Sequence, residues 1–343
     1  MTEIYIIRHA EAEGNLYRRM HGQYDSLLTP RGYMQLEDLA RRFEDVHIDA
    51  VYSSDLFRTR ETARAVYERK GLPLILEPRL RELAFGVWED LPFGDVLARA
   101  GESWRLFEFD PWHWSVEGGE TFGAVCGRVT EAIADIAAQN DGKSVAVFTH
   151  GCAIRILLCE ILGVTAPDRL GEVPYVFNTG VTRLRCDGDG IAIAYSGDAS
   201  HLSATSSVRG GAPRQELPRW VNDTNMRFAR ETDGGAAVYG ALLGTARVGE
   251  LELDEERGAQ NGEGWITRCS LVEQLRGCGL GVQLIGQAVS RYRALGRQKL
   301  MLSPADEKSA GFFSHQGFSP SLSSPQSVFE RAIDGEEFRL LRL

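Results

Sequence analysis

Hydrophobic positions in the first 200 residues alternate between short apolar runs and stretches with helical spacing. Residues 4–7, 50–54 and 144–148 are almost continuously apolar, which is typical of strands buried on both faces. Thr29 and Pro30 form a helix start, because Thr29 can cap the helix and Pro30 has no amide to leave unpaired. Strands separated by helices predict an α/β sandwich.

The pattern changes after residue 200. Between residues 201 and 218, Ser, Gly, Ala and Pro predominate, which predicts an exposed linker. Strand candidates follow at 236–243, 246–253 and 265–272, and then a glycine-rich turn and an amphipathic helix over 280–295. Because 343 residues exceed what one core usually holds, we expect domains at 1–202 and 220–343, joined by a linker at 203–219.

Composition narrows the class of protein. A net charge of −10 argues against nucleic-acid binding, which needs a basic face, but a few arginines suffice for a small anionic substrate. The most apolar run, 145–164, is interrupted by His150, Arg155 and Glu160, so we expect no membrane span. Without a signal-peptide pattern or a CxxC pair among six cysteines, the sequence predicts a cytoplasmic protein with reduced thiols and no metal site.

Chemically distinctive side chains follow the predicted strands of the first part. Arg8 and His9 come directly after the first strand, Arg58 comes soon after the second, and His150 ends the strand at 144–148. The carboxyl ends of parallel strands face the crevice where α/β proteins bind ligands. An arginine beside a histidine there combines an anion clamp with a nucleophilic nitrogen. We therefore expect a site for an anionic substrate.

With Glu82 in its own segment downstream, these motifs resemble the histidine phosphatase superfamily, over about residues 1–202. The resemblance implies a phosphoglycerate mutase-like three-layer α/β/α sandwich in which His9 attacks phosphorus and carries a transient phosphohistidine. It also implies that Arg8, Arg58 and His150 hold the phosphoryl oxygens and that Glu82 protonates the leaving oxygen. Two guanidiniums and an imidazolium would replace a metal in neutralising the phosphoryl charge.

Further positions match the same family. Asn15 and Gln23 correspond to residues that line the phosphate pocket, and residues 118–121 and 178–182 match segments with a structural role. The sequence departs from the commonest family form at Ala10, where that form has glycine.

Mutases and phosphatases share this apparatus. A mutase must keep its phosphohistidine from water and hold a carboxylate, whereas a phosphatase admits water. The covering segment 85–117 is short and residues 178–182 are similar to the phosphatase branch, which favours a phosphatase acting on a small phosphorylated metabolite. Trp104, Trp112 and Trp114 in the covering segment would contact an apolar substrate group or pack within the cap.

A glycine-rich turn opens the helix predicted in the second part. Such a turn presents backbone amides at the positive end of the helix dipole, which makes an anion site. A Rossmann loop would follow the first strand of its domain, whereas this turn follows several. Residues 265–281, together with 309–318, resemble a GNAT-type N-acetyltransferase, a mixed α/β domain, over about residues 220–335.

The second resemblance implies bound acetyl-CoA. Val272 would lie on the strand beside the pantetheine arm, and the pyrophosphate would contact the amides of Arg276, Gly277, Cys278, Gly279, Leu280 and Gly281. The Arg276 side chain would only pack. Many family members carry a tyrosine that protonates the departing thiolate, but this chain has Phe313 there, which has no proton to give. The residues do not identify the amine that would accept the acetyl group.

We therefore expect a bifunctional enzyme, a histidine phosphatase fused to an acetyltransferase. Two alternatives remain open. One is a phosphoglycerate mutase-type isomerase with a degenerate second domain. The other is a phosphatase regulated by a second domain that binds acyl-CoA without catalysis.

Overall fold

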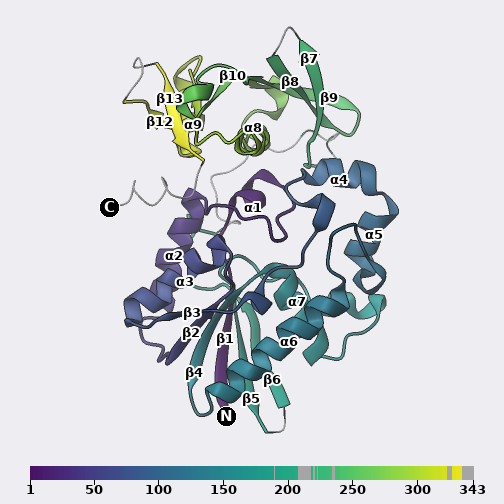
Figure 1. Ribbon diagram of the computed structural model, residues 1–343, viewed down its shortest axis with the longest axis vertical. Helices are drawn as coiled ribbons and strands as arrows, with labels where there is room; N and C mark the ends of the chain where they lie inside the picture. Colours follow the sequence, from purple (N-terminus) through teal and green to yellow (C-terminus); the bar gives the residue numbers. More distant parts are fainter. Residues whose placement is uncertain are drawn as a thin grey trace. The chain divides into compact units, whose positions relative to one another are not determined.

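Two separate β-sheets organise the chain in the computed structural model, which describes residues 1–188, 190–207, 218, 221, 223–233, 236–322 and 327–333 (Figure 1). The first unit comprises Met1–Glu13, Met20–Glu89 and Ala100–Ala212. The second comprises Gly14–Arg19, Asp90–Arg99 and Pro213–Leu343. The division between Ala212 and Pro213 falls inside the predicted linker, but residues 208–217, 219 and 220 lie outside the described residues.

The sheet of the first unit has six strands in the order β3-β2-β4-β1-β5-β6. They are β1 (Thr2–Arg8), β2 (Ala50–Ser53), β3 (Leu74–Leu76), β4 (Ser144–Thr149), β5 (Val181–Asp187) and β6 (Gly190–Asp198). The first four strands are parallel to one another. β5 pairs antiparallel with β1, and β6 pairs antiparallel with β5. The strands predicted at 4–7 and 144–148 lie at its centre, where Ile4 and Val147 are fully buried. Their continuous apolar pattern follows from that burial on both faces.

Helices cover both faces of this sheet (Figure 1). The long ones are α2 (Pro30–Arg42), α3 (Phe57–Lys70), α6 (Phe122–Gln139) and α7 (Gly151–Ile161). The crossovers through α2 and α3 advance along the sheet in one direction, and the crossover that contains α6 advances in the other. Because such crossovers are right-handed, α2 and α3 lie on one face of the sheet and α6 lies on the opposite face. Because α7 packs against α6, the unit has three layers, and the predicted α/β/α sandwich is confirmed. The start of α2 is also as predicted, since the Thr29 side chain accepts a hydrogen bond from the Gly32 amide.

The first residues of the predicted linker pack against α2. The Gln35 side chain donates to the Ser206 carbonyl at 3.0 Å, and Asp38 accepts from the Ser203 amide at 2.9 Å and from the Ser206 hydroxyl. Ser206 is fully buried. Ser203, Ala204 and Thr205 are exposed, as expected from composition, so the exposed connection excludes Ser206 but not its neighbours.

An aromatic cluster fills the segment that follows Glu82. Its rings lie 5.1–6.4 Å apart between centroids and belong to Phe85, Trp88, Trp104, Phe107 and Trp114. Trp112 packs separately against Phe122, at 5.1 Å. Trp104 and Trp114 therefore pack within the covering segment, as one of the two expected roles requires, whereas Trp112 packs against the start of α6. The shorter helices near this segment are α4 (Phe93–Ala100), which lies mostly in the second unit, and α5 (Glu102–Phe109).

The second unit has a seven-stranded sheet in the order β12-β13-β11-β10-β9-β8-β7. The strands are β7 (Arg227–Asp233), β8 (Ala236–Leu243), β9 (Ala246–Asp254), β10 (Glu263–Leu271), β11 (Lys299–Leu302), β12 (Ser319–Pro320) and β13 (Phe329–Ala332). Only β10 and β11 are parallel neighbours, and α8 (Val282–Ala294) connects them. Residues 267–271 of β10 extend past the pairing with β11, so among the described residues they have a neighbouring strand, β9, on one side only.

Helix α8 covers the core of this mixed α/β unit. Its residues Leu284, Ile285, Ala288 and Tyr292 are at most 1% exposed, which confirms the single apolar face predicted from their spacing. α9 (Glu307–His315) follows β11, and α1 (Glu13–Tyr17) belongs mostly to this unit. Within the described residues, no helix has the length and apolar character that crossing a membrane would need.

Gly86 tests the packing of the segment after Glu82. It has a φ of +51°, and a Cβ there would collide with the backbone carbonyl of Glu117. Gly71 has a φ of +65° but open space around it. Both alanine substitutions should cost about 1–2 kcal/mol for the left-handed backbone, and Gly86→Ala should cost roughly 1–3 kcal/mol more. Urea unfolding of both variants measures the difference, and equal losses would contradict it.

Candidate active site

Three neighbouring parallel strands of the first unit end at the same edge and present polar side chains there. His9 follows β1, His150 follows β4 and Ser54 follows β2. The amide of His9 donates to the carbonyl of Thr149 at 3.0 Å. The rings of His9 and His150 lie 5.3 Å apart between centroids and are 3% and 0% exposed. The structure therefore brings the two predicted histidines together.

The hydrogen bond of each ring indicates where its proton lies. His9 Nδ1 is 2.7 Å from the carbonyl oxygen of Ala10, which can only accept, so Nδ1 carries the proton and Nε2 keeps its lone pair. His150 Nε2 is 2.9 Å from the Ser54 hydroxyl. A neutral ring that accepts there carries its own proton on Nδ1. His9 thus presents a nucleophilic nitrogen, and in the tautomer whose Nε2 accepts from Ser54, His150 presents a donor at Nδ1.

Arg8 and Arg58 are anchored by backbone carbonyls. The fully buried Arg58 donates to two of them at 2.7 and 3.1 Å, and Arg8 donates to the Val176 carbonyl at 2.6 Å. The Nε atoms of both arginines and Nδ1 of His150 are buried and have no hydrogen-bond partner among the described residues. Because buried polar groups are almost always paired, three such nitrogens in one cluster indicate a place for a ligand with several acceptor oxygens.

Burial and neighbouring charge set the ionisation of these groups. Burial lowers the pKa of His9 well below its ordinary value, and the charges of Arg58 and Arg8 lower it further. Burial, Arg58 and His9 likewise lower the pKa of His150, so that ring is neutral at neutral pH. The imidazolium expected at position 150 is therefore absent from the ligand-free protein. Burial also lowers the pKa of Arg58, to about 10, which still leaves it charged.

Glu82 lies beside the two arginines. Burial lowers the pKa of both arginines, and the negative charge of Glu82 partly offsets that lowering. Its carboxylate accepts hydrogen bonds from the amides of Cys152 at 3.1 Å and Ala153 at 3.0 Å, in the first turn of α7. A helix N-terminus favours a negative charge at this position. Since His150 is the residue before α7, the same helix start positions both side chains.

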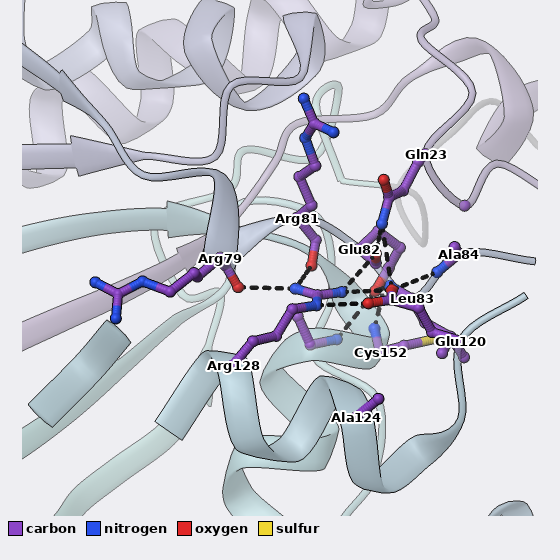
Figure 2. Close-up of polar contacts among 12 residues, drawn as sticks. Gln23, Arg79, Arg81, Glu82, Leu83, Ala84, Glu120, Ala124, Arg128 and Cys152 are labelled. Carbon is purple, nitrogen blue, oxygen red and sulfur yellow. Dashed lines mark hydrogen bonds and ion pairs between the residues drawn. The ribbon is translucent and has the colours of Figure 1, made fainter. Parts of the chain in front are cut away.

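The loop that carries Glu82 is fixed by Arg128 of α6. Figure 2 shows its guanidinium among the carbonyls of Arg79, Arg81 and Glu82 and the carboxylate of Glu120, at 2.6–2.9 Å. Gln23, predicted to line the phosphate pocket, joins this network through bonds of 3.2 Å to the Glu82 carbonyl and to Glu120.

The remaining residues divide into those predicted and those missed. Asn15 lies in α1, within the segment Gly14–Arg19 grouped with the second unit, and its match to a phosphate pocket stays a prediction. Sequence reasoning missed Ser54 and Arg128. Ser54 carried a signal, since it follows a predicted parallel strand. Arg128 carried none, because it lies in the middle of a helix whose pattern shows only its apolar face.

The glycine-rich turn of the second unit has the predicted geometry. Gly277 and Gly279 have φ of +78° and +77°, which favour glycine, and α8 begins at Val282. Within the described part of the chain, the amides of Gly279, Leu280 and Gly281 have no hydrogen-bond acceptor. Such amides at a helix start suit the pyrophosphate of a nucleotide cofactor.

Other residues of this region have structural roles. Arg276 donates to the carbonyl of Leu271, at the end of β10, which agrees with packing as its only role. Val272 is 39% exposed at the end of the same strand. Phe313 is buried, with its ring 5.1 Å from that of Phe312 and 5.6 Å from that of Phe318. It is a core residue and donates no proton.

No metal centre is visible in the part of the chain that the structure describes, where no three His, Cys, Asp or Glu side chains are grouped to hold an ion.

Two family models match the sequence. The model of the histidine phosphatase superfamily (branch 1) matches residues 4–199, and that of the acetyltransferase (GNAT) family matches residues 203–318.

Individual relatives resemble the first part of the chain. A probable phosphoglycerate mutase GpmB of Erwinia tasmaniensis is 32% identical over 212 residues, which cover 60% of this chain and 97% of the relative. Phosphoserine phosphatase 1 of Hydrogenobacter thermophilus is 32% identical over 164 residues, covering 48% and 78%. The solved structure of Bacillus stearothermophilus YhfR matches with a TM-score of 0.56 and 33% identity, covering 59% of this chain and 99% of that one.

These matches agree with the site geometry and with the order of the two sheets along the chain. Through residues 4–199 the chain belongs to branch 1 of the histidine phosphatase superfamily, and residues 203–318 add a domain of the GNAT acetyltransferase family.

Proposed function

We propose that the first unit hydrolyses phosphomonoesters of small metabolites through a phosphohistidine on His9, without a metal. The observation that carries this proposal is the set of three buried nitrogens without partners beside a neutral His9. Phosphoryl transfer depends on positioning and on charge neutralisation, which two guanidiniums and a histidine donor supply. We also propose a cytoplasmic location and a domain boundary within residues 203–219.

The reaction would proceed in two steps. His9 Nε2 attacks phosphorus, the bond to the ester oxygen breaks, and that oxygen takes a proton from Glu82, which would acquire it when the negative phosphoryl group binds beside the carboxylate. Water then attacks the phosphohistidine, Glu82 takes a proton from the water, and inorganic phosphate leaves with its bond to Nε2 broken. A positioned acid of this kind contributes roughly 10²–10⁴-fold to the rate. The negative charge of a bound phosphoryl group would also raise the pKa of His150 and favour its charged form.

A hydrolase is favoured over an isomerase by the arginines that flank the acid loop. Arg81 is paired with Asp55 at 2.7 Å, and Arg128 is paired with Glu120 at 2.8 Å. A phosphoglycerate substrate needs a further cation for its carboxylate, and these two are already engaged. The similar proteins carry both names, a probable mutase and a phosphoserine phosphatase, so the isomerase remains the alternative function.

For the second unit, we propose that it binds acetyl-CoA and transfers the acetyl group to an amine. The amides from Arg276 to Gly281 would hold the pyrophosphate, and Val272 would lie beside the pantetheine arm. Bound acetyl-CoA supplies a thioester whose acyl group an amine can take. Since Phe313 has no proton to give, the departing thiolate would take its proton from water or another residue. A domain that binds acyl-CoA without catalysis and regulates the phosphatase is the alternative.

His9→Ala should abolish phosphate release from small phosphomonoesters in excess EDTA, because it removes the Nε2 atom that would carry the phosphoryl group. His47, whose side chain is 81% exposed, provides the control, and His47→Ala should keep wild-type turnover. Phosphate release is measured across a panel of esters that includes phosphoserine and phosphoglycerate. Interconversion of phosphoglycerates without release of phosphate would indicate the isomerase instead.

Protein stability should report the lowered pKa of His9. In the unfolded chain this histidine takes up a proton near pH 6.5, whereas in the folded protein it stays neutral to lower pH. The free energy of unfolding should therefore fall as pH drops below 6.5, by about 1.4 kcal/mol per pH unit for each such histidine. Urea unfolding at pH 7 and pH 5.5 should show a smaller loss for His9→Gln than for the wild type. Equal losses would mean that His9 titrates normally.

The proposed pyrophosphate site depends on exposed amides at Gly279. Gly279→Val should weaken acetyl-CoA binding, measured by calorimetry, by at least tenfold, because a branched side chain obstructs the amides. Gly244→Val is the matched control, since Gly244 has a φ of +58° and a Cβ added there would meet no neighbouring atom within 4 Å. It imposes a similar backbone strain in the same unit and should leave binding unchanged. Unchanged affinity in Gly279→Val would exclude this site.

A further inference from the structure

The turn formed by residues 176–180 makes five hydrogen bonds to the consecutive site residues Arg8 and His9, one of them from the Thr179 amide to the His9 carbonyl at 3.4 Å. Asn178 Nδ2 donates to the His9 carbonyl at 2.9 Å, the Thr179 amide to the Arg8 carbonyl at 3.1 Å, the Arg8 amide to the Gly180 carbonyl at 3.3 Å, and the Arg8 guanidinium to the Val176 carbonyl at 2.6 Å. The antiparallel pairing of β5 with β1, which places Val181 opposite Ile7, brings the turn to this position.

Thr179 has an unusual backbone for its residue type. Its φ is +55°, a region that β-branched residues rarely adopt, and its side chain is fully buried. Strained conformations of this kind persist where the surroundings over-determine them, and they gather at functional sites. Here the left-handed backbone lets the Thr179 amide and the Asn178 side chain point toward the same pair of residues.

A chain of polar side chains supports Thr179 from behind. Its hydroxyl donates to the Asn178 carbonyl at 2.8 Å and lies 3.1 Å from Nε2 of His201, which therefore donates to it. His201 Nδ1 accepts from Arg42 at 3.1 Å, and Arg42 is paired with Asp198 at 2.7 Å. Burial and Arg42 lower the pKa of His201 to about 4, so the ring stays neutral and each donor has its acceptor at neutral pH.

We propose that Asn178 and Thr179 are positioning residues that clamp the backbone of His9 and so align its Nε2 with the phosphoryl group. The inference rests on the proposed phosphohistidine chemistry. The Arg58 and His150 side chains have anchors of their own, and the Arg8 guanidinium is held by the Val176 carbonyl, which neither Asn178 nor Thr179 supplies. The clamp should therefore affect the nucleophile more than the binding of phosphate. A nucleophile displaced by about 1 Å loses on the order of 10²-fold in rate.

Asn178→Ala tests the clamp, with Asn140→Ala as its matched control. Asn140 is 4% exposed, and its Nδ2 also donates to a backbone carbonyl, that of Ile136 at 2.8 Å, away from the site. Asn178→Ala should lower kcat roughly 10–100-fold, while the inhibition constant of inorganic phosphate stays within about threefold of the wild type. Asn140→Ala should change neither quantity, whatever its effect on stability.

Thr179 provides a second pair of variants that keeps the test valid if Asn178→Ala folds poorly. Thr179→Ser retains the hydroxyl and should keep kcat within about threefold of the wild type, whereas Thr179→Val retains the shape but loses the hydroxyl and should lower kcat about tenfold. Equal kcat in the wild type, Asn178→Ala and Thr179→Val overturns the clamp alone. A wild type that releases no more phosphate than His9→Ala overturns the proposed function and the clamp with it.

Discussion

The candidate site of the first unit is organised around buried nitrogens that have no hydrogen-bond partner, at the carboxyl ends of the parallel strands. A buried donor without an acceptor is costly, and this cluster holds three among the described residues, from Arg8, Arg58 and His150. The surroundings limit that cost in specific ways. Backbone carbonyls accept hydrogen bonds from one terminal nitrogen of Arg8 and from both terminal nitrogens of Arg58, and the charge of Glu82 partly offsets the burial that lowers the pKa of both arginines. The loops and helices around the cluster hold these carbonyls and the Glu82 carboxylate in place.

Two rigid supports come from opposite sides of the cluster. On one side, Arg128 joins the carbonyls of Arg79, Arg81 and Glu82 to the carboxylate of Glu120, so the position of Glu82 depends on helix α6 (Figure 2). On the other side, the turn before β5 holds the backbone of His9. The proposed nucleophile His9 and the proposed acid Glu82 are therefore positioned by elements far apart in the sequence, and each support bonds to backbone carbonyls, which every residue type has.

The sequence allowed the fold and the centre of the site to be predicted, because both leave local patterns. Apolar runs located β1, β2 and β4, and His9 and His150, each two residues past the end of such a run, lie together in the structure. Arg128 left no such pattern, since its acceptors are carbonyls more than 40 residues away. The neutral state of His150 was also beyond prediction, because its pKa depends on burial and on the charge of Arg58, which only the folded chain brings near. The packing of Ser203 and Ser206 against α2 was missed for a related reason, since small polar residues indicate a loop without showing whether it is buried.

The three unpaired nitrogens also link stability to the ionic composition of the solution. A ligand that binds only the folded state stabilises it in proportion to the logarithm of its concentration, by about 2.7 kcal/mol at a hundred times its dissociation constant. Any small oxyanion that satisfies these donors therefore acts on the folding equilibrium of the first unit as well as on its chemistry. Under the proposed function, inorganic phosphate is such an oxyanion, and its concentration would set part of the resistance of this unit to heat and proteolysis.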